Sequence, residues 1–517
     1  MNRENYIAKI DKIASSNIGQ RAIAKKIIEA IDEKDLDDVW GYVSQRVKIG
    51  FTFDEAPEVN NQAVSVVKEN EKLFIDSPNE NTIEHKLIIG ENYDALKNLL
   101  VTYVDSQGKG LIDIIYIDPP YNTERSQIEG NDYKDEVKAN KFIYRDKFTR
   151  DGWLNMMNER LKLAKRLLSD KGVIFISIDD TEQAYLKVLC DEIFGEENFE
   201  NFIWQKKGGA GNTEKIIGCL TEHILCYFKK KEPRIFNYRE IERVYKFKDE
   251  KGYYNLEGIE KTNLGKQYHR RTMLFPIIDD ETGKEFMPSK NMRWTEGKKS
   301  IDKLKAEKRL YFDYKKKKVK KKKYAEDYEL SENVYYNLLT GLGSLSTAKD
   351  ELGDILGNRE EFETPKPTEL IMHLLEISSK KDSIVLDFFA GSGTTGQAVM
   401  ELNAEDGGTR KFILVTNNDK EKDNATKITR ERLYRVINGK GSKGEKIEWE
   451  YSALLNNTVR VFGFKTESLT IADIAKAEKI KTEAEEDFKK LNEKYETKSD
   501  LDIYTQLASL KPQESEK

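Results

Sequence analysis

Short, almost entirely apolar segments alternate with helical patterns in two separate parts of the chain, and this alternation limits the fold more than any other feature. The segments LIDIIYI (111–117) and GVIFISI (172–178) leave almost no polar face, as expected of strands covered on both sides. Apolar residues then recur every three or four positions over about 154–168 and 181–194. Alternating strand and helix predicts an α/β fold, a doubly wound and mostly parallel sheet.

The same rhythm divides the chain into five regions. Helical spacing over 7–47, followed by the turn-rich DSPNEN (76–81), predicts a helical N-terminal region over 1–80. The segments above belong to a region over 81–204, and between 205 and 356 the rhythm is lost, which predicts an inserted domain. Strand and helix patterns resume over 357–440. The C-terminal extension, 441–517, contains a charged amphipathic helix over about 471–495, able to pack on the body or on a second copy.

Composition sets broader limits. The 517 residues, 38% of them hydrophobic, are enough for two or three domains with their own cores. No run approaches the roughly 18 apolar residues of a membrane span, and the first residues lack the apolar core of a secretory signal. We therefore expect a cytoplasmic protein without a membrane partner. Three cysteines and four histidines without ligand spacing predict neither a disulfide nor a metal site.

Positive charge gathers in the middle of the chain although the net charge is −5. The run YKKKKVKKKKY (314–324) holds eight lysines, and WQKKGG (204–209) adds two. Such runs are most often solvated faces or loops, and they indicate DNA binding only if the flanking domains give DNA a reason to be there. The candidate phosphate contacts are Lys206, Lys207, Lys315, Lys316, Lys317, Lys318, Lys320, Lys321, Lys322 and Lys323.

The first apolar strand ends abruptly in Asp118, Pro119, Pro120 and Tyr121. The prolines supply no backbone N–H, so the strand must stop at Asp118, at the carboxyl edge where open α/β sheets bind ligands. Taken alone, this segment is explained equally well as a strand terminator with a surface aspartate.

A second strand pattern runs into the glycine-rich segment DFFAGSGTTG (387–396). Gly391, Gly393 and Gly396 fit the spacing G-x-G-x-x-G after a strand and before a helix, which lets backbone N–H groups approach a ligand closely. A tight turn and a dinucleotide site both fit this pattern. The next strand ends in VTNND, without the acidic residue expected for a NAD ribose, and no Lys-Ser or Lys-Thr follows the glycines as in a phosphate loop.

Together, the DPPY and DFFAGSGTT segments resemble the catalytic motif and the S-adenosylmethionine motif of amino-group DNA methyltransferases. Their order, with an insert between them, resembles the beta class of that family, in which the insert is a target-recognition domain. FETPKPTELI (362–371), GVIFISIDD (172–180) and IFGEENFENFIWQKK (193–207) are similar to further segments of the family, and TNND (416–419) to the Mod subunits of type III restriction–modification systems. The resemblance covers about 86–438 and implies a Rossmann-like methyltransferase sheet.

The resemblance implies roles for individual residues. The Asp118 carboxylate and the Pro119 carbonyl would accept hydrogen bonds from an exocyclic amine and draw its delocalised lone pair back toward nitrogen, with Pro120 stiffening the segment. Tyr121 would stack on a base flipped out of the duplex. No metal is required, because the sulfonium is an activated methyl donor. The implied cofactor contacts are Asp387, Phe389, Ala390, Gly391, Ser392, Gly393, Thr394 and Thr395, with Lys366, Pro367, Asn92 and Asn418 as further candidates.

We therefore predict a DNA adenine-N6 methyltransferase that uses S-adenosylmethionine and base flipping, as the modification subunit of a type III system. The expected partners are double-stranded DNA, a second copy of the chain and a separate translocase–nuclease subunit. A solitary or type II adenine methyltransferase, a cytosine-N4 methyltransferase, an idle DNA-binding specificity subunit and a Rossmann oxidoreductase remain as alternatives.

Overall fold

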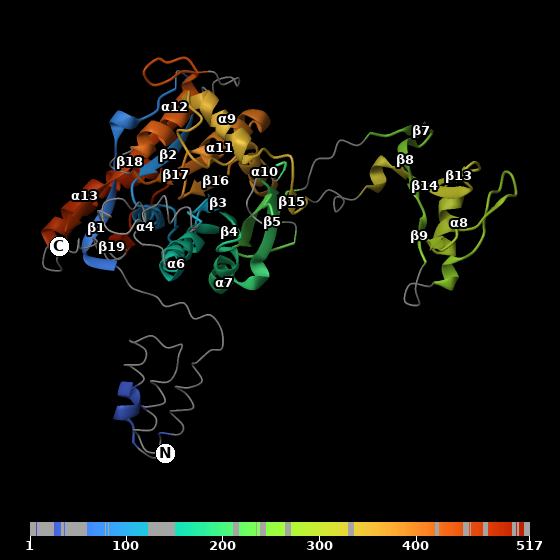
Figure 1. Cartoon of the computed structure of the whole chain (residues 1–517), viewed down its shortest axis with the longest axis horizontal. Helices are drawn as coiled ribbons and strands as arrows, with labels where there is room; N and C mark the ends of the chain where they lie inside the picture. Colours follow the sequence, from blue (N-terminus) through green and yellow to red (C-terminus); the bar gives the residue numbers. More distant parts are fainter. Residues whose placement is uncertain are drawn as a thin grey trace. The chain divides into compact units, whose positions relative to one another are not determined.

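The computed structural model describes residues 7, 25–32, 36, 59–77, 79, 80, 82–121, 150–209, 217–233, 235–237, 244–263, 270–328, 335–418, 423–447, 454, 456–468, 474–498, 503 and 506–510. They form two compact units, residues 1–237 with 337–517 and residues 238–336 (Figure 1). Most of the N-terminal segment with helical spacing, over 7–47, lies outside the described residues.

The first unit is built on one eleven-stranded sheet. Its central strands run parallel to one another in the order β4 (Leu168–Ile178), β3 (Ile112–Ile117), β16 (Ile384–Asp387), β17 (Lys411–Thr416), β2 (Ile83–Ile89) and β18 (Asn457–Ser468). One edge continues with β6 (Thr221–Phe228), β5 (Phe199–Gln205) and β15 (Leu338–Leu339), and the other with β1 (Val59–Glu69) and β19 (Ala508–Leu510). The predicted mostly parallel sheet is confirmed.

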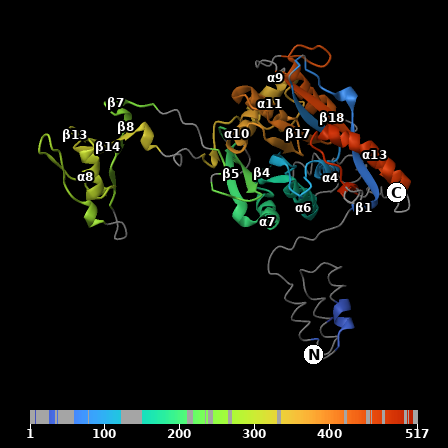
Figure 2. The ribbon, with the colours of Figure 1, turned by 180° about the vertical axis from the view of Figure 1, so that it is seen from behind.

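Helices cover both faces of this sheet, as a doubly wound fold requires (Figures 1 and 2). On one face α6 (Arg150–Leu167) packs on α4 (Asn92–Thr102) and α7 (Gln183–Phe194), while α13 (Ile474–Leu491) packs on α4 and β1. On the other face α10 (Thr368–Ser378) packs on α11 (Thr394–Asp406), and α12 (Glu431–Asn438) packs on α9 (Leu345–Leu356) and α11.

The apolar patterns correspond to burial on both sides of the sheet. All of β3 except Asp113 is buried, and Met157, Leu161 and Ala164 of α6 are fully buried. A strand covered on both faces has no solvent side for polar residues, which explains the almost continuous apolar runs.

The two ends of the chain extend the sheet. The N-terminal region, residues 1–80, was expected to be helical, but residues 59–69 form β1, which pairs antiparallel with β18 and buries Val64, Val66 and Val67. The predicted C-terminal helix is present as α13, and Ile480, Ala484, Phe488 and Leu491 of this helix are buried in the core of the same chain. These four residues therefore have their partners within the same chain.

The second unit is a small β-rich body. An antiparallel sheet has the order β13 (Leu310–Asp313), β14 (Lys318–Tyr324), β8 (Gly252–Gly258) and β7 (Phe247–Asp249). Two strand pairs, β10 (Ile277–Ile278) with β11 (Glu285–Phe286) and β9 (Glu260–Thr262) with β12 (Met292–Trp294), accompany helix α8 (Lys298–Ala306). The unit is shorter than the insert expected over 205–356, because β6, β15 and α9 belong to the first unit.

Short helical turns complete the elements. The 3-10 turns are η2 (Glu71–Leu73), η3 (Glu196–Asn198), η4 (Arg271–Met273) and η5 (Ala325–Asp327), and η7 (Ala425–Arg430) is a π-helical stretch leading into α12. Of the helices in the described part of the chain, none combines the length and the apolar character that crossing a bilayer needs.

Candidate active site

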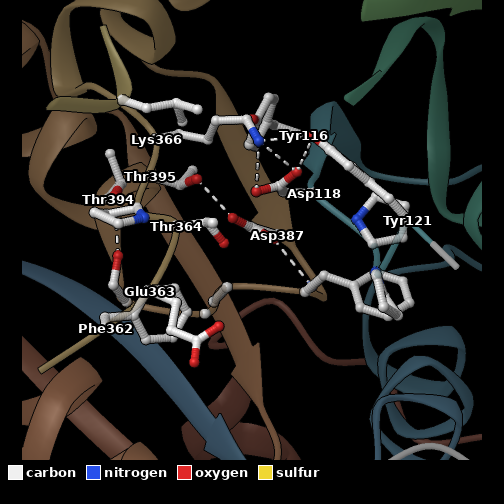
Figure 3. A pocket seen from close by; sticks show the side chains of 18 of the residues that line it. Tyr116, Asp118, Tyr121, Phe362, Glu363, Thr364, Lys366, Asp387, Thr394 and Thr395 are labelled. Carbon is white, nitrogen blue, oxygen red and sulfur yellow. Dashed lines mark hydrogen bonds and ion pairs between the residues drawn. The ribbon is translucent and has the colours of Figure 1, made fainter. Parts of the chain in front are cut away.

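The register of the sheet brings the two sequence motifs to the same edge. β3 and β16 are parallel neighbours, with Ile114 opposite Val385 and Ile115 opposite Leu386. Both strands end shortly beyond this pairing, so Asp118 and Asp387 emerge together at the carboxyl edge, where such sheets bind ligands. A cavity of about 540 Å³ opens at this point (Figure 3).

The cavity is lined by both motifs and by the segment that precedes α10. The lining residues are Tyr116, Asp118, Pro119, Pro120, Tyr121, Glu222, Leu345, Lys349, Glu360, Phe362, Glu363, Thr364, Pro365, Lys366, Asp387, Phe389, Ala390, Gly391, Ser392, Thr394 and Thr395. Of the predicted catalytic and cofactor residues, only Asn92, Pro367, Gly393 and Asn418 do not line it.

Asp118 is held by a lysine and a tyrosine. Lys366 Nζ donates to Asp118 Oδ1 at 2.9 Å and to Oδ2 at 3.0 Å, and the Tyr121 hydroxyl donates to Oδ1 at 2.6 Å (Figure 3). Lys366 also donates to the Tyr121 hydroxyl at 2.6 Å and lies over the Tyr121 ring. Lys366, predicted as a cofactor contact, thus contacts Asp118, the predicted catalytic aspartate.

Glu222 is the main residue that the sequence analysis missed. It comes from β6, is only 4% exposed, and places Oε2 3.3 Å from Lys366 Nζ and 3.4 Å from the Tyr121 hydroxyl. Its Oε1 accepts from Lys206 Nζ at 3.0 Å. The signal was a single carboxylate at the start of the otherwise apolar strand TEHILCYF. Lys206, predicted as a DNA contact, is therefore engaged inside the first unit.

The charges in this cluster shift one another's pKa values. Burial raises the pKa of Asp118, although Lys366 and Tyr121 act to lower it. Burial would lower the pKa of Lys366, but the carboxylates of Asp118 and Glu222 raise it above its ordinary value. Burial would raise the pKa of Glu222, but Lys366 and Lys206 hold it below its ordinary value. The ion pairs thus favour the charged forms of Lys366 and Glu222 inside the protein.

A hydrogen bond from α6 holds the second proline of the DPPY segment. The Pro120 carbonyl accepts a hydrogen bond of 2.7 Å from Nε1 of Trp153, a fully buried residue of α6. Because proline fixes its own φ and this carbonyl is held, the DPPY segment has little conformational freedom.

The cofactor turn is organised by Asp387 and two glycines. Asp387 accepts from the Thr395 hydroxyl at 2.6 Å and from the Phe389 N–H at 3.0 Å, and burial raises its pKa to about 7. Gly391 and Gly393 adopt positive φ values of 51° and 83°, which favour glycine. Gly393 is the N-cap residue of α11.

Phe362 packs against the glycine turn at Gly391. A Cβ atom added to Gly391 would lie 3.2 Å from Phe362 Cζ, tighter than ordinary contact. The segment FETPKP therefore reaches over the glycine turn through Phe362 and toward Asp118 through Lys366.

Arg432 of α12 supports the turn from behind and was not predicted. Its guanidinium, 1% exposed, donates to the hydroxyls of Ser392 at 3.2 Å and Thr394 at 2.7 Å. It also bonds Gln397, Thr368 and Glu351 on three other helices. One buried side chain thus connects the turn with α9, α10 and α11.

The weaker cofactor candidates have other contacts. Asn92 lies at the start of α4, donates to the Phe388 carbonyl at 2.9 Å and accepts from the buried Arg160. Asn418, after β17, donates to Asp423 at 2.7 Å. Pro367 is the N-cap residue of α10.

The lysine run is divided between a turn, residues 314–317, and the strand that follows it. Lys318–Tyr324 is β14, in which Lys318, Lys321 and Lys322 pair with acidic residues of the same unit. The side chains of Lys315, Lys316, Lys317 and Lys320 have no acidic partner within the described part of the unit. The described residues likewise contain no cluster of three His, Cys, Asp or Glu side chains that could hold a metal ion.

Comparison with known proteins identifies two family models. One, described as DNA methylase, matches residues 112–427. The other, described only as an uncharacterised conserved protein, matches residues 3–108.

Three curated relatives are similar over most of this chain. The StyLTI Mod subunit of a type III restriction–modification enzyme from Salmonella typhimurium is 33% identical over 69% of this chain and 58% of its own length. The EcoPI Mod subunit from Escherichia phage P1 is 30% identical over 74% and 65%, respectively. The type II methyltransferase M.KpnI of Klebsiella pneumoniae is 31% identical over 66% of this chain and 82% of its own length. The chain thus spans about 58–65% of the two Mod subunits.

Proposed function

Because the chain belongs to the DNA methylase family, we propose that it transfers a methyl group from S-adenosylmethionine to the N6 atom of adenine in duplex DNA. We further propose that it acts as the modification subunit of a type III restriction–modification system, as the names of two relatives indicate for those proteins. The observation that carries the proposal is the shared cavity, in which the DPPY segment and the glycine turn form adjoining walls.

The residues of the turn fit the cofactor. Gly391 leaves the space beside Phe362 free of side-chain atoms, and the hydroxyls of Thr394 and Ser392 border the cavity. Asp387 offers a carboxyl group to the amino-acid end of S-adenosylmethionine. S-adenosylmethionine would supply an activated methyl group at this position. Phe389, Ala390 and Gly391 would contact it along the turn.

The DPPY segment fits an amine substrate. The Asp118 carboxylate and the Pro119 carbonyl are acceptors, and an amino group that donates to both regains electron density on nitrogen. The Trp153 hydrogen bond holds the segment, which keeps these acceptors in place before the substrate arrives. The Tyr121 ring borders the same cavity and offers a face for an extruded base.

The function is tested by incubating the purified chain with S-adenosylmethionine and duplex DNA and analysing the digested DNA by mass spectrometry. N6-methyladenine is expected, and N4-methylcytosine alone would contradict the adenine assignment. Asp118→Ala is expected to reduce methylation by orders of magnitude while affinities for cofactor and DNA stay within several-fold. Wild-type methylation by Asp118→Ala would refute the catalytic role.

Tyr121 is tested with 2-aminopurine at the target position, whose fluorescence reports base flipping. Tyr121→Ala is expected to weaken capture of the base by about 1–3 kcal/mol of stacking. Tyr121→Phe keeps the ring and is expected to retain capture, although it loses the hydroxyl contacts to Asp118 and Lys366. Equal loss of capture in both variants would contradict stacking.

A second candidate is a methyltransferase that acts without a nuclease, because M.KpnI, a type II methyltransferase, is similar over most of its own length. We expect the chain alone not to cut DNA, and restriction to require a separate translocase–nuclease subunit. Cleavage by the purified chain with ATP and magnesium would contradict both candidates. Copurification of such a subunit from the native host would favour the type III assignment.

A further inference from the structure

Glu222 is a buried carboxylate that contacts Tyr121 of the DPPY segment and the lysine that holds Asp118. Lys366 Nζ contacts both Glu222 and Asp118, so one ammonium group bridges the two carboxylates. Glu222 also lies 3.4 Å from the Tyr121 hydroxyl. It reaches the cavity from β6, three strands away from β16 in the sheet. Burying a carboxylate costs free energy unless it is paired, so we expect a function that explains the position of Glu222.

The buried cluster balances its charges. Asp118 and Glu222 carry negative charge, while Lys366 and Lys206 carry positive charge. Lys366 is shared between the two carboxylates, and Lys206 contacts Glu222 only. Removing one member leaves the others with an uncompensated charge in a site of low dielectric constant.

Lys366 competes with the proposed substrate for Asp118. Its ammonium contacts both carboxylate oxygens, at 2.9 and 3.0 Å, and these are the atoms that a target amine needs. Glu222 offers the ammonium a second anionic partner at 3.3 Å, so a small shift toward Glu222 frees an oxygen of Asp118.

We propose that Lys366 and Glu222 are positioning residues that act through Asp118. Lys366 keeps Asp118 ionised, and Glu222 shares the ammonium so that Asp118 retains an oxygen for the target amine. The inference rests on the proposed function, because Asp118 has this task only if an amine is the substrate.

The two partners act on Asp118 in opposite directions. The charge of Lys366 lowers the pKa of Asp118 and the charge of Glu222 raises it, while burial raises it most. Glu222 also raises the pKa of Lys366. Among the residues that the structure describes, the titratable or charged groups that face Asp118 are Lys366 from the segment before α10, Tyr121 from its own loop, Glu222 from β6, Tyr116 from β3 and Asp387 from β16.

The test compares single-turnover methylation as a function of pH in Lys366→Met, Glu222→Gln and the double variant. Lys366→Met is expected to move the acid limb of the rate profile to higher pH, by about one unit or more. Glu222→Gln is expected to move the acid limb to lower pH, and the alkaline limb as well. The double variant is expected to return the acid limb toward the wild type, because the net charge of the cluster is restored.

Glu200→Gln is the matched control, since Glu200 lies on the neighbouring strand β5, pairs with Lys231 at 2.7 Å and does not line the cavity. It is expected to leave the profile unchanged. S-adenosylmethionine affinity, measured by calorimetry, is expected to stay within several-fold in all variants. If Lys366→Met does not fold, Glu222→Gln and the double variant carry the test.

Loss of rate without opposite shifts of the acid limb would overturn the inference and leave the methyltransferase assignment intact. If the wild-type chain methylates no DNA, the proposed function fails and the inference fails with it. The two failures are therefore told apart by the wild-type reaction.

Discussion

Gly391 must meet two demands at once, a left-handed backbone and the absence of a side chain. Its φ is 51°, and Phe362 occupies the direction in which a Cβ atom would point. Gly407, at the end of α11, shares the left-handed backbone with a φ of 67°, but no atom lies within 4 Å of an added Cβ. Substitutions at Gly391 and Gly407 therefore distinguish the cost of backbone strain from the loss of space at the site.

We expect Gly391→Val to abolish binding of S-adenosylmethionine, because the new side chain displaces Phe362 and enters the cavity. Gly407→Val is expected to carry a similar backbone cost, about 1–2 kcal/mol, without loss of binding. Calorimetric titration of both variants, alongside their melting temperatures, checks this. An unchanged affinity in Gly391→Val would overturn the cofactor assignment of the turn.

At the scale of elements, α12 connects the glycine turn with the helices around it through Arg432. Arg435 lies one helical turn after Arg432 in α12, pairs with Glu431 at 2.8 Å and does not contact the glycine turn. The two arginines thus distinguish support of the helix from support of the turn.

We expect Arg432→Met to lower thermal stability and to weaken S-adenosylmethionine binding about tenfold or more, ~1.4 kcal/mol. Its loss leaves Glu351 partly buried without its cation and frees the hydroxyls of Ser392 and Thr394. Arg435→Met is expected to lower stability while affinity stays unchanged. Equal affinities in the two variants would show that the turn does not depend on α12.

The lysine run, in β14 and in the turn that precedes it, contains two kinds of lysine, and they need separate substitutions. Changing Lys315, Lys316, Lys317 and Lys320 to Gln is expected to weaken binding to target and non-target DNA alike. The slope of log affinity against log salt is expected to fall by up to about 0.9 for each lost phosphate contact. Changing Lys318, Lys321 and Lys322 instead breaks ion pairs within the unit and is expected mainly to lower stability. Fluorescence anisotropy over a salt series, with melting curves, separates the two, and a loss limited to target DNA would instead indicate base readout.

At the scale of the whole molecule, two buried carboxyl groups make stability depend on pH. Burial raises the pKa of Asp387 and of Glu401 to about 7, from 3.8 and 4.5. Because the folded state then holds protons that the unfolded chain has released, this contribution is complete below about pH 4 and is lost as pH rises through about 7. Burial acts to raise the pKa of Glu84, but Arg460 and Lys86 bring it below its ordinary value, so its contribution to stability is lost as pH falls and not as pH rises.

We therefore expect the melting temperature to fall between about pH 5 and about pH 8. The double variant Asp387→Asn, Glu401→Gln is expected to show a smaller fall, because it has no carboxyl group to ionise at these positions. Thermal denaturation of both proteins over this range measures the difference. Parallel curves would show that neither carboxyl group titrates there.

The sequence by itself determined the features that depend on neighbouring residues. The central strands, the amphipathic helices, the end of β3 at Asp118 and the glycine turn after β16 are encoded in local apolar patterns and in the backbone limits of proline and glycine. The position of Asp118 at the carboxyl edge also followed from the strand pattern, whereas the pairing of β3 with β16, which brings the glycine turn beside it, came from the structure.

Only the tertiary structure decided which distant side chains complete the site. Glu222 and Lys366 lie far from Asp118 along the chain, and β6 brings Glu222 back by running antiparallel to β4. Arg432 reaches the turn only because α12 packs behind it. For the same reason, the sequence did not predict the contacts of Lys206 and Asn92 or the ion pairs of the β14 lysines. The partner of a polar side chain is known only once the fold has brought the two together. Residue type and spacing describe one chain segment at a time, whereas a buried charge is defined by what surrounds it.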